Sequence, residues 1–178
     1  AMGCIGAWVT RNLVRSNAEV TIFDLSPHMH RLQLIMTESE LKNVIFVEGD
    51  ITNTDTVKQS LINSGANYII HLGALQVPFC KADPPGGAAV NVLGTVNLFE
   101  AAKEAGINHL VYASSIAVYG EREFYSTELL QHNSFLYPQN HYGVYKQANE
   151  GTAKIYWQDD KIASTGLRPF TVYGPGRD

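Results

Sequence analysis

The sequence alternates short apolar runs with longer helical segments, and this alternation constrains the fold more than any other feature. Runs typical of buried strands lie at residues 20–23, 44–47, 68–72, 109–113 and 163–170. Segments typical of helices lie before and between them, at residues 7–14, 28–41, 55–64, 88–105 and 142–159. Strands that alternate with helices form parallel sheets with right-handed crossovers. We therefore predict an α/β fold with a doubly wound parallel sheet, in which residues 1–178 form one domain.

The composition argues against several classes of function. The net charge is −4 and Lys and Arg do not cluster, so neither nucleic acid nor an acidic membrane surface is an expected partner. No apolar run approaches the roughly 18 residues that a membrane-spanning helix needs. The two cysteines, Cys4 and Cys80, are too few for a disulfide framework, and no metal-ligand spacing is present. We expect a soluble cytoplasmic protein without a metal.

A glycine pair opens the first helical segment. Gly3-x-x-Gly6 corresponds to the second half of a G-x-x-G-x-x-G phosphate turn. Such glycines let the backbone approach a pyrophosphate, and the helix N-terminus offers free N–H groups and the positive end of a dipole. A helix that packs tightly on a sheet also favours glycines, so this pair alone leaves both interpretations open.

An acidic residue follows the first predicted strand at the spacing of a dinucleotide-binding unit. Asp24 stands 18 residues after Gly6. At this position a carboxylate accepts the two hydroxyls of the adenosine ribose and repels a 2′-phosphate, which favours NAD over NADP. The alternative is that Asp24 only caps the turn at Ser26-Pro27.

Ligands of doubly wound sheets bind beyond the carboxyl ends of the strands. The residues that fall at such ends are Gly3, Asp24, Asp50, Gly73, Ser115 and Thr171. Their convergence predicts one ligand site at this edge of the sheet.

Tyr142 and Lys146 are four residues apart and therefore share one face of a predicted helix. A free Tyr is only about 0.1% phenolate at neutral pH. A cation at ~4 Å in a dielectric of about 20 contributes roughly 4 kcal/mol, or about three pKa units. We expect this pair to act as a proton-transfer device, with an ordinary amphipathic surface pair as the alternative.

Taken together, these motifs resemble the extended short-chain dehydrogenase/reductase family, the NAD-dependent sugar epimerases and dehydratases. The resemblance covers essentially the whole chain. The matching motifs are Gly3-x-x-Gly6, Asp24, Asp50-Ile51, His71-Leu72-Gly73-Ala74, Asn91-x-x-Gly94-Thr95, Ser114-Ser115-x-x-Val118-Tyr119-Gly120, Tyr142-x-x-x-Lys146 and Leu167-Arg168-Pro169-Phe170.

The resemblance implies NAD as the cofactor in a Rossmann-type domain. The implied cofactor-binding residues are Gly3, Ile5, Gly6, Asp24, Asp50, Ile51, Leu72, Gly73, Ala74, Asn91, Tyr142, Lys146 and Pro169. The implied catalytic residues are Ser115, which hydrogen-bonds the reacting oxygen, Tyr142, which moves the proton, and Lys146, which holds the nicotinamide ribose and keeps the Tyr142 pKa low.

The chain also departs from the family pattern. Ser115, Gln76 and Thr171 are the implied substrate-binding residues, but Gln76 stands where galactose epimerases carry Lys, and Thr171 replaces a common Asn. The usual first strand, first glycine and C-terminal substrate domain have no counterpart here, so we expect the domain to be incomplete.

Three functions fit these observations. The first is a sugar-nucleotide epimerase or related oxidoreductase that passes hydride to and from nicotinamide. The second is a simple NAD-dependent dehydrogenase of a small hydroxylated substrate, such as a sugar acid or hydroxy-amino acid. The third is a dinucleotide-binding regulator without turnover. Dehydration is disfavoured because Ile116 and Ala117, which follow Ser115, cannot exchange protons, whereas the family's dehydratases carry an acidic pair there.

The resemblance further implies a homodimer formed by two helices of each subunit, at residues 88–105 and 142–159. These helices carry more apolar residues than one sheet-facing stripe needs. The residues concerned are Val92, Val96, Leu98, Phe99, Ile155, Tyr156 and Trp157. The alternative is that all of them pack against their own sheet.

Overall fold

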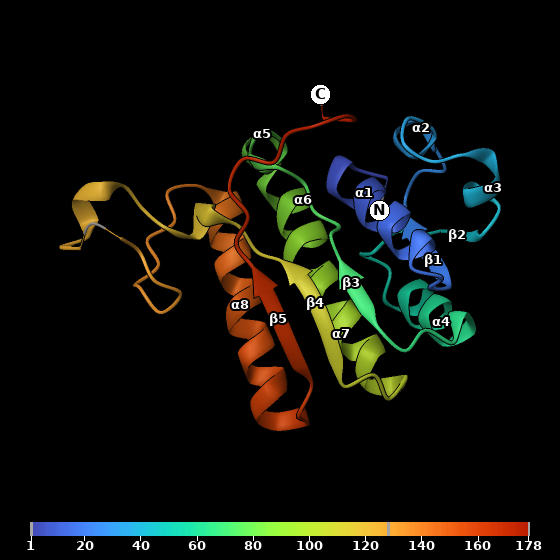
Figure 1. Ribbon diagram of the computed structural model, residues 1–178. Helices are drawn as coiled ribbons and strands as arrows, with labels where there is room; N and C mark the ends of the chain where they lie inside the picture. Colours follow the sequence, from blue (N-terminus) through green and yellow to red (C-terminus); the bar gives the residue numbers. More distant parts are fainter. Residues whose placement is uncertain (1, 128, 178) are drawn as a thin grey trace.

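The structure, a computed structural model, describes residues 2–127 and 129–177 (Figure 1). The strands are β1 (Val20–Asp24), β2 (Val44–Glu48), β3 (Ile69–His71), β4 (His109–Ala113) and β5 (Ala163–Leu167). The α-helices are α1 (Cys4–Arg15), α2 (His30–Gln33), α3 (Glu38–Leu41), α4 (Thr54–Ser64), α5 (Val77–Ala82), α6 (Pro84–Ala88), α7 (Gly94–Glu104) and α8 (His141–Asp160). A π-helix, η1 (Ala89–Leu93), joins α6 to α7, and the short 3₁₀ helices η2 (Ile116–Val118) and η3 (Arg122–Phe124) follow β4.

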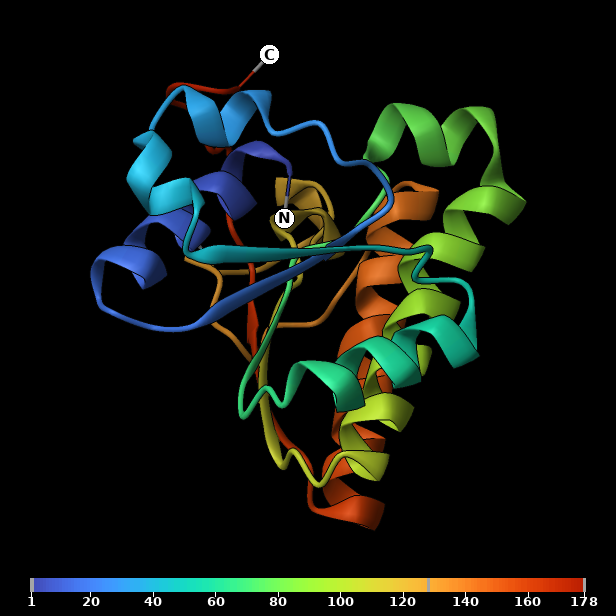
Figure 2. The same ribbon diagram turned by 90° about the vertical axis from the view of Figure 1, so that its right-hand side faces the viewer.

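All the strand pairs are parallel, as predicted. β1 pairs with β2 from Val20↔Val44 onward, and β4 pairs with β3 on one side and β5 on the other. Figure 2 shows α1 to α3 on one face of the strands and α4, α7 and α8 on the other. The predicted Rossmann-type α/β arrangement is therefore confirmed.

The strands form two sheets rather than one. The strand order is β1-β2 in the first sheet and β3-β4-β5 in the second. Within the described residues, no strand pairs with the second edge of β1 or with the outer edge of β3. A single added strand between these two edges would complete the order 3-2-1-4-5-6 of a doubly wound sheet. The discontinuity lies where the sequence predicts a missing strand.

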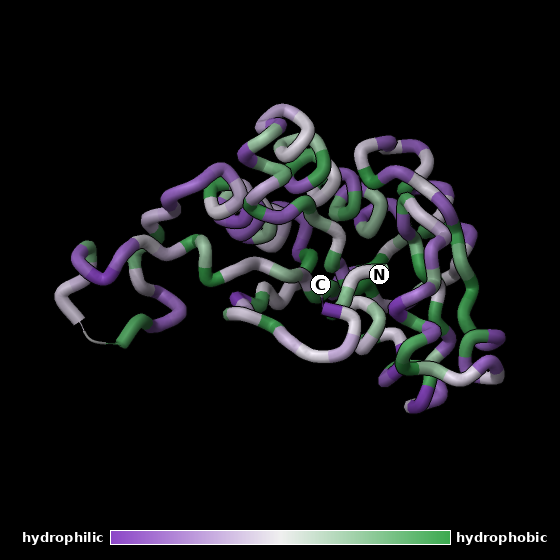
Figure 3. Tube along the Cα trace, turned by 90° about the horizontal axis from the view of Figure 1, so that it is seen from above, coloured by the Kyte–Doolittle hydropathy of each residue, from purple (hydrophilic) through white to green (hydrophobic). Residues whose placement is uncertain are grey.

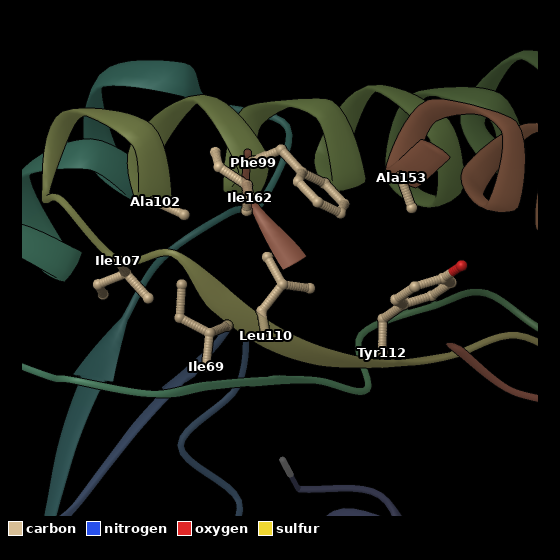
Figure 4. Close-up of a cluster of buried hydrophobic side chains, with 8 residues drawn as sticks. All are labelled: Ile69, Phe99, Ala102, Ile107, Leu110, Tyr112, Ala153 and Ile162. Atoms are coloured by element: carbon tan, nitrogen blue, oxygen red, sulfur yellow. The ribbon is translucent and has the colours of Figure 1, made fainter. Parts of the chain in front are cut away.

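Two apolar cores hold the layers together. Figure 4 shows the larger one, in which Phe99 of α7 and Ala153 of α8 lie over Leu110 and Tyr112 of β4. The second core joins α1 to β1 and α2 through Val14, Ile22 and Leu32. Hydrophobic and hydrophilic positions alternate along the helices in Figure 3, as expected for helices with one face against a sheet.

Local signals explain where several helices begin and end. Asn53 caps α4 by accepting a hydrogen bond from the Thr56 N–H, and Gly65 ends this helix in the left-handed conformation at φ 61°. Asn140 caps α8 in the same way, by accepting from the Gly143 N–H. This cap fixes the start of the helix that carries Tyr142 and Lys146.

The predicted element bounds were wrong in three places. The single helix expected over residues 28–41 is two short helices, because Thr37 and Glu40 form a capping box that starts α3 anew. The break expected at residues 83–87 is helix α6, which Asp83 caps by accepting from the Gly86 N–H, with Pro in its first turn. The last strand ends at Leu167 rather than at residue 170.

Candidate active site

The N-terminus of α1 has the features of an anion site. Gly3 is the N-cap in an extended conformation, it has no capping side chain, and a Cβ built on it would meet nothing within 4 Å. The first intrahelical bond runs from the Ala7 N–H to the Gly3 carbonyl, so the N–H groups of residues 4–6 have no partner within the helix. Ile5 is half-buried beside the buried Gly6. The open backbone and the dipole fit a pyrophosphate.

Asp24 lies beside this turn, at the end of β1. Its Oδ2 accepts a hydrogen bond from the Met2 N–H at 2.9 Å. Burial raises the pKa of Asp24, but several lowering interactions, among them hydrogen bonds from the backbone N–H groups of Met2 and Ser26, together outweigh it and leave the pKa below its usual value. An ionised carboxylate next to the glycine turn fits the ribose of NAD. The bond from Ser26 shows that Asp24 also caps the following turn, as the alternative interpretation predicts.

Asp50 and Ile51 follow β2. Asp50 Oδ1 accepts hydrogen bonds from the N–H and the hydroxyl of Thr52, each at 2.8 Å. Ile51 packs against α7 so closely that a Cβ on Gly94 would lie 2.7 Å from its side chain. The Ile51 side chain also lies near Gly73, so the ends of β2 and β3 meet at one place.

Asn91 supports the loop after β3 from inside the protein. It is fully buried in η1, and its side chain accepts from the Leu75 N–H at 2.7 Å and donates to the Leu75 carbonyl at 2.9 Å. These bonds bring the loop that contains Leu72, Gly73 and Ala74 against η1. The geometry shows that Asn91 positions this loop, and its contact with the cofactor stays a prediction.

Ser115, Tyr142 and Lys146 come together at the end of β4. Ser115 is the N-cap of η2, and its side chain interacts with the Tyr142 phenol and lowers its pKa, although burial raises that pKa more. Lys146 is 2% exposed; its Nζ donates to the Ala113 carbonyl at 2.6 Å and lies 5.7 Å from the centre of the Tyr142 ring. The alternative of a surface pair is therefore wrong.

The electrostatics of this group differ from the prediction. Burial lowers the pKa of the Lys146 ammonium to about 8. Burial raises the pKa of Tyr142, and the interaction with Ser115 only partly offsets this rise. The expected lowering of the Tyr142 pKa by Lys146 is not present in this structure, because the ammonium points to a backbone carbonyl rather than to the phenol oxygen.

Gly143 permits the close approach between α8 and the loop after β4. A Cβ on this glycine would lie 2.2 Å from the Ala117 carbonyl oxygen and 2.9 Å from Pro138. Any other residue would push Tyr142 away from Ser115. Gly143 was not among the predicted site residues, although a glycine between Tyr142 and Lys146, in the first turn of a helix, is a signal that the sequence contains.

The remaining predicted residues lie at the periphery. The Pro169 carbonyl accepts from the Ile116 N–H at 3.3 Å, so the end of β5 lies next to the Ser115 loop. Gln76, the N-cap of α5, and Thr171 are both exposed. Their contacts with the substrate stay predictions.

The C-terminal segment crosses back over α1, which the sequence did not predict (Figure 1). The Pro175 carbonyl accepts from Trp8 Nε1 at 3.1 Å, and the Gly176 carbonyl accepts from Arg31 Nε at 2.8 Å. The two ends of the described chain therefore meet at the anion site.

In residues 2–127 and 129–177, no group of three or more His, Cys, Asp or Glu side chains could hold a metal ion. Over the same residues, no helix is both long and apolar enough to cross a membrane.

Helix α1 opens with a glycine, and Asp24 stands at the end of the strand that follows it. Ser115, Tyr142 and Lys146 come together at the carboxyl end of β4. These features define a dinucleotide-binding α/β domain. Residues 1–178 match the NAD dependent epimerase/dehydratase family. The chain belongs to this family, whose cofactor is NAD, as predicted.

Several of the relatives are named as sugar epimerases. The chain is 33% identical to the UDP-glucose 4-epimerase of Mycolicibacterium smegmatis, over 100% of this chain and 56% of that protein. It is 31% identical to UDP-glucuronate 4-epimerase 6 of Arabidopsis thaliana, over 98% of this chain and 39% of that protein.

Solved structures agree with these relatives. The structure matches the Thermus thermophilus UDP-glucose 4-epimerase complex with NAD with a TM-score of 0.85, at 27% identity, over 99% of this chain and 55% of that one. It matches the UDP-N-acetylglucosamine 4-epimerase of Methanobrevibacter ruminantium with a TM-score of 0.86, also at 27% identity, over 99% of this chain and 55% of that one. The chain thus spans about half the length of the proteins it resembles.

Proposed function

We propose that the protein is an NAD-dependent 4-epimerase of a nucleotide sugar, with a UDP-linked sugar as the substrate. The observation that carries the proposal is the group of Ser115, Tyr142 and the buried Lys146 at the carboxyl end of β4, with Gly3 and Asp24 at the carboxyl end of β1. The named relatives act on UDP-linked sugars, which supports the substrate class.

Each residue of the group has a separate task. Ser115 holds the reacting hydroxyl of the sugar, and Tyr142 takes its proton and later returns it. Lys146 supplies positive charge close to Tyr142 and holds the nicotinamide ribose. Gly3, Gly6 and Asp24 hold the pyrophosphate and the adenosine ribose. Bound NAD supplies the acceptor and donor of hydride. Ile116 and Ala117 offer no further acid or base, so the site is suited to epimerisation rather than to dehydration.

The proposal is tested by supplying NAD and UDP-glucose and following UDP-galactose by NMR. A Tyr142→Phe variant keeps the ring but loses the proton-transferring oxygen, and we expect turnover to fall by about 10²- to 10⁴-fold with NAD binding retained. Tyr68→Phe is the control, because Tyr68 is 78% exposed and remote from the group. Near-normal turnover by the Tyr142 variant would contradict the assignment. Stoichiometric accumulation of NADH by the wild type would indicate a simple dehydrogenase instead.

The proposal includes a homodimer through α7 and α8. Ile155 and Trp157 are each 53% exposed, and Val96 and Ile155 line an open hollow between the two helices. Phe99 and Tyr156, however, stack on each other at 4.7 Å inside the subunit, so the interface is narrower than the sequence suggested. The cytoplasmic location stays a prediction.

A further inference from the structure

A charged pair with no part in the chemistry above lies behind the Ser115 loop. Arg168 directly follows β5, and Glu150 lies on α8, eight residues after Tyr142. The pair is bidentate, with Arg168 Nε 2.8 Å from Glu150 Oε1 and Arg168 Nη2 2.6 Å from Glu150 Oε2. Their side chains are only 19% and 17% exposed. An ion pair this buried is weak evidence for added stability, because the free-energy cost of taking both charges out of water opposes their mutual attraction.

The pair extends by hydrogen bonds into the segments that carry the reacting groups. Glu150 Oε1 also accepts from the Ser114 hydroxyl at 2.5 Å, and Ser114 is 1% exposed and adjacent to Ser115. Arg168 Nη1 donates to the Tyr119 hydroxyl, and it also donates to the His132 carbonyl at 2.9 Å. One ion pair therefore ties the ends of β4 and β5, helix α8, and the 121–139 excursion to one another.

From this geometry we infer that Glu150 and Arg168 are a positioning pair that holds the Ser115 hydroxyl against Tyr142. The inference rests on the proposed function, in which Ser115 and Tyr142 must act on the same oxygen. Ser115 lies on the loop after β4 and Tyr142 lies on α8, so the distance between them depends on what fixes that loop to the helix. The bond from Ser114 to Glu150 is one such link, and Arg168 fixes the direction of the Glu150 carboxylate.

The charge state of the pair suits this task. Burial raises the pKa of Glu150, but the hydrogen bonds from Arg168 and Ser114 outweigh it and hold the pKa below its ordinary value. The carboxylate is therefore ionised at neutral pH and accepts from both partners. A misplacement of about 1 Å between reacting groups can lower a rate by about 10²-fold, so even a small shift of the loop has a measurable effect.

The test uses two variants. Glu150→Gln keeps the size of the side chain and Arg168→Lys keeps its positive charge, but neither variant can form the bidentate ion pair. We expect kcat to fall by about 10²-fold in each, with NAD binding unchanged. Ser114→Ala keeps the ion pair but cuts its link to the loop, and should give a smaller loss. Glu104→Gln is the matched control, because it removes one carboxylate from the remote ion pair between Lys58 and Glu104.

The pH profile of kcat separates positioning from a direct charge effect. Burial is the largest influence on the Tyr142 pKa and raises it. The Ser115 side chain and the Arg177 charge lower this pKa, and Cys80 raises it. Loss of Ser115 alignment should therefore move the acid limb of the profile to higher pH. Removal of the Glu150 charge alone would move it to lower pH, since a nearby anion disfavours the phenolate. Arg168→Lys changes no charge and should still move the limb upward.

Crystal structures of the variants give a readout that needs no activity. We expect the distance between Ser115 Oγ and the Tyr142 hydroxyl oxygen to lengthen in Glu150→Gln and Arg168→Lys, but not in Glu104→Gln. Unchanged distances and pH profiles, even with lower thermal stability, would show a purely structural pair and overturn the inference. Lengthened distances in a protein that does not turn over UDP-sugars would leave the inference standing and refute the proposed function. If Glu150→Gln does not fold, Ser114→Ala and Arg168→Lys decide.

Discussion

At the scale of single residues, Gly143 sets the distance between Tyr142 and Ser115. A Cβ at this position would lie 2.2 Å from the Ala117 carbonyl oxygen and 2.9 Å from the Pro138 side chain, which leaves little room to move. We predict that Gly143→Ala shifts the start of α8 and lowers turnover by about 10²-fold. The control is Gly151→Ala on the same helix, where a Cβ meets nothing within 4 Å. There the added methyl should stabilise the helix by about 0.5–1 kcal/mol, measured by urea unfolding, with turnover unchanged. Full activity in Gly143→Ala would disprove the close-packing argument.

The residues that the sequence indicated are those whose type is dictated by chemistry. Gly3, Asp24 and the pair of Tyr142 and Lys146 stand at spacings set by local geometry, and the structure places them at the carboxyl ends of β1 and β4, although their roles stay predictions. The tasks of Asn91 and Gly143 depend on neighbours far away in the sequence. The raised pKa of Tyr142 depends on burial, which a spacing rule does not contain.

At the scale of elements, α7 and α8 leave an apolar surface that the subunit does not cover. The two helices pack on the sheet through Phe99 and Ala153, while Ile155 and Trp157 remain half-exposed. We predict a dimer at micromolar concentration in sedimentation experiments, and a monomer for Ile155→Glu, because an unpaired charge in an apolar interface is costly. Leu129→Glu is the control, since Leu129 is 82% exposed on the 121–139 excursion. A monomeric wild type would contradict the prediction.

Helices and strands could be predicted because the spacing of apolar residues indicates which face of each element is buried. The exceptions, the divided helix at 28–41 and helix α6, both depend on caps. The capping box of Thr37 and Glu40 starts a new helix where helix propensity alone suggests that one helix continues. Asp83 accepts from the Gly86 N–H and starts a helix where propensity alone suggests a break. Residues 84–87, two Pro and two Gly, are helical because the Pro residues occupy the first turn.

At the scale of the whole molecule, the division into two sheets decides how well the site is held. Gly3 and Asp24 lie on the β1 side of the discontinuity, whereas Ser115 and Lys146 lie on the β4 side. In the described residues, no main-chain hydrogen bond between strands joins the sheet of β1 to the sheet of β4. The contacts that do cross are side-chain and tail contacts, such as Trp8 and Arg31 with the Pro175 and Gly176 carbonyls.

We therefore predict that the 178-residue chain binds NAD more weakly, and turns over UDP-sugars more slowly, than a chain in which a strand joins the two sheets. The facing edges of β1 and β3 leave main-chain groups without strand partners, and Ile70 of β3 is 42% exposed. Each such group left unsatisfied on burial costs about 1–3 kcal/mol, against a net stability of about 5–15 kcal/mol for a domain. An engineered extension that adds an apolar strand of about five residues ahead of Ala1 should raise the urea midpoint and tighten NAD binding, measured by calorimetry. A Gly/Ser extension of equal length is the control and should do neither. Tight NAD binding and full turnover by the unextended chain would show that side-chain and tail contacts hold the two sheets in register without a strand between them.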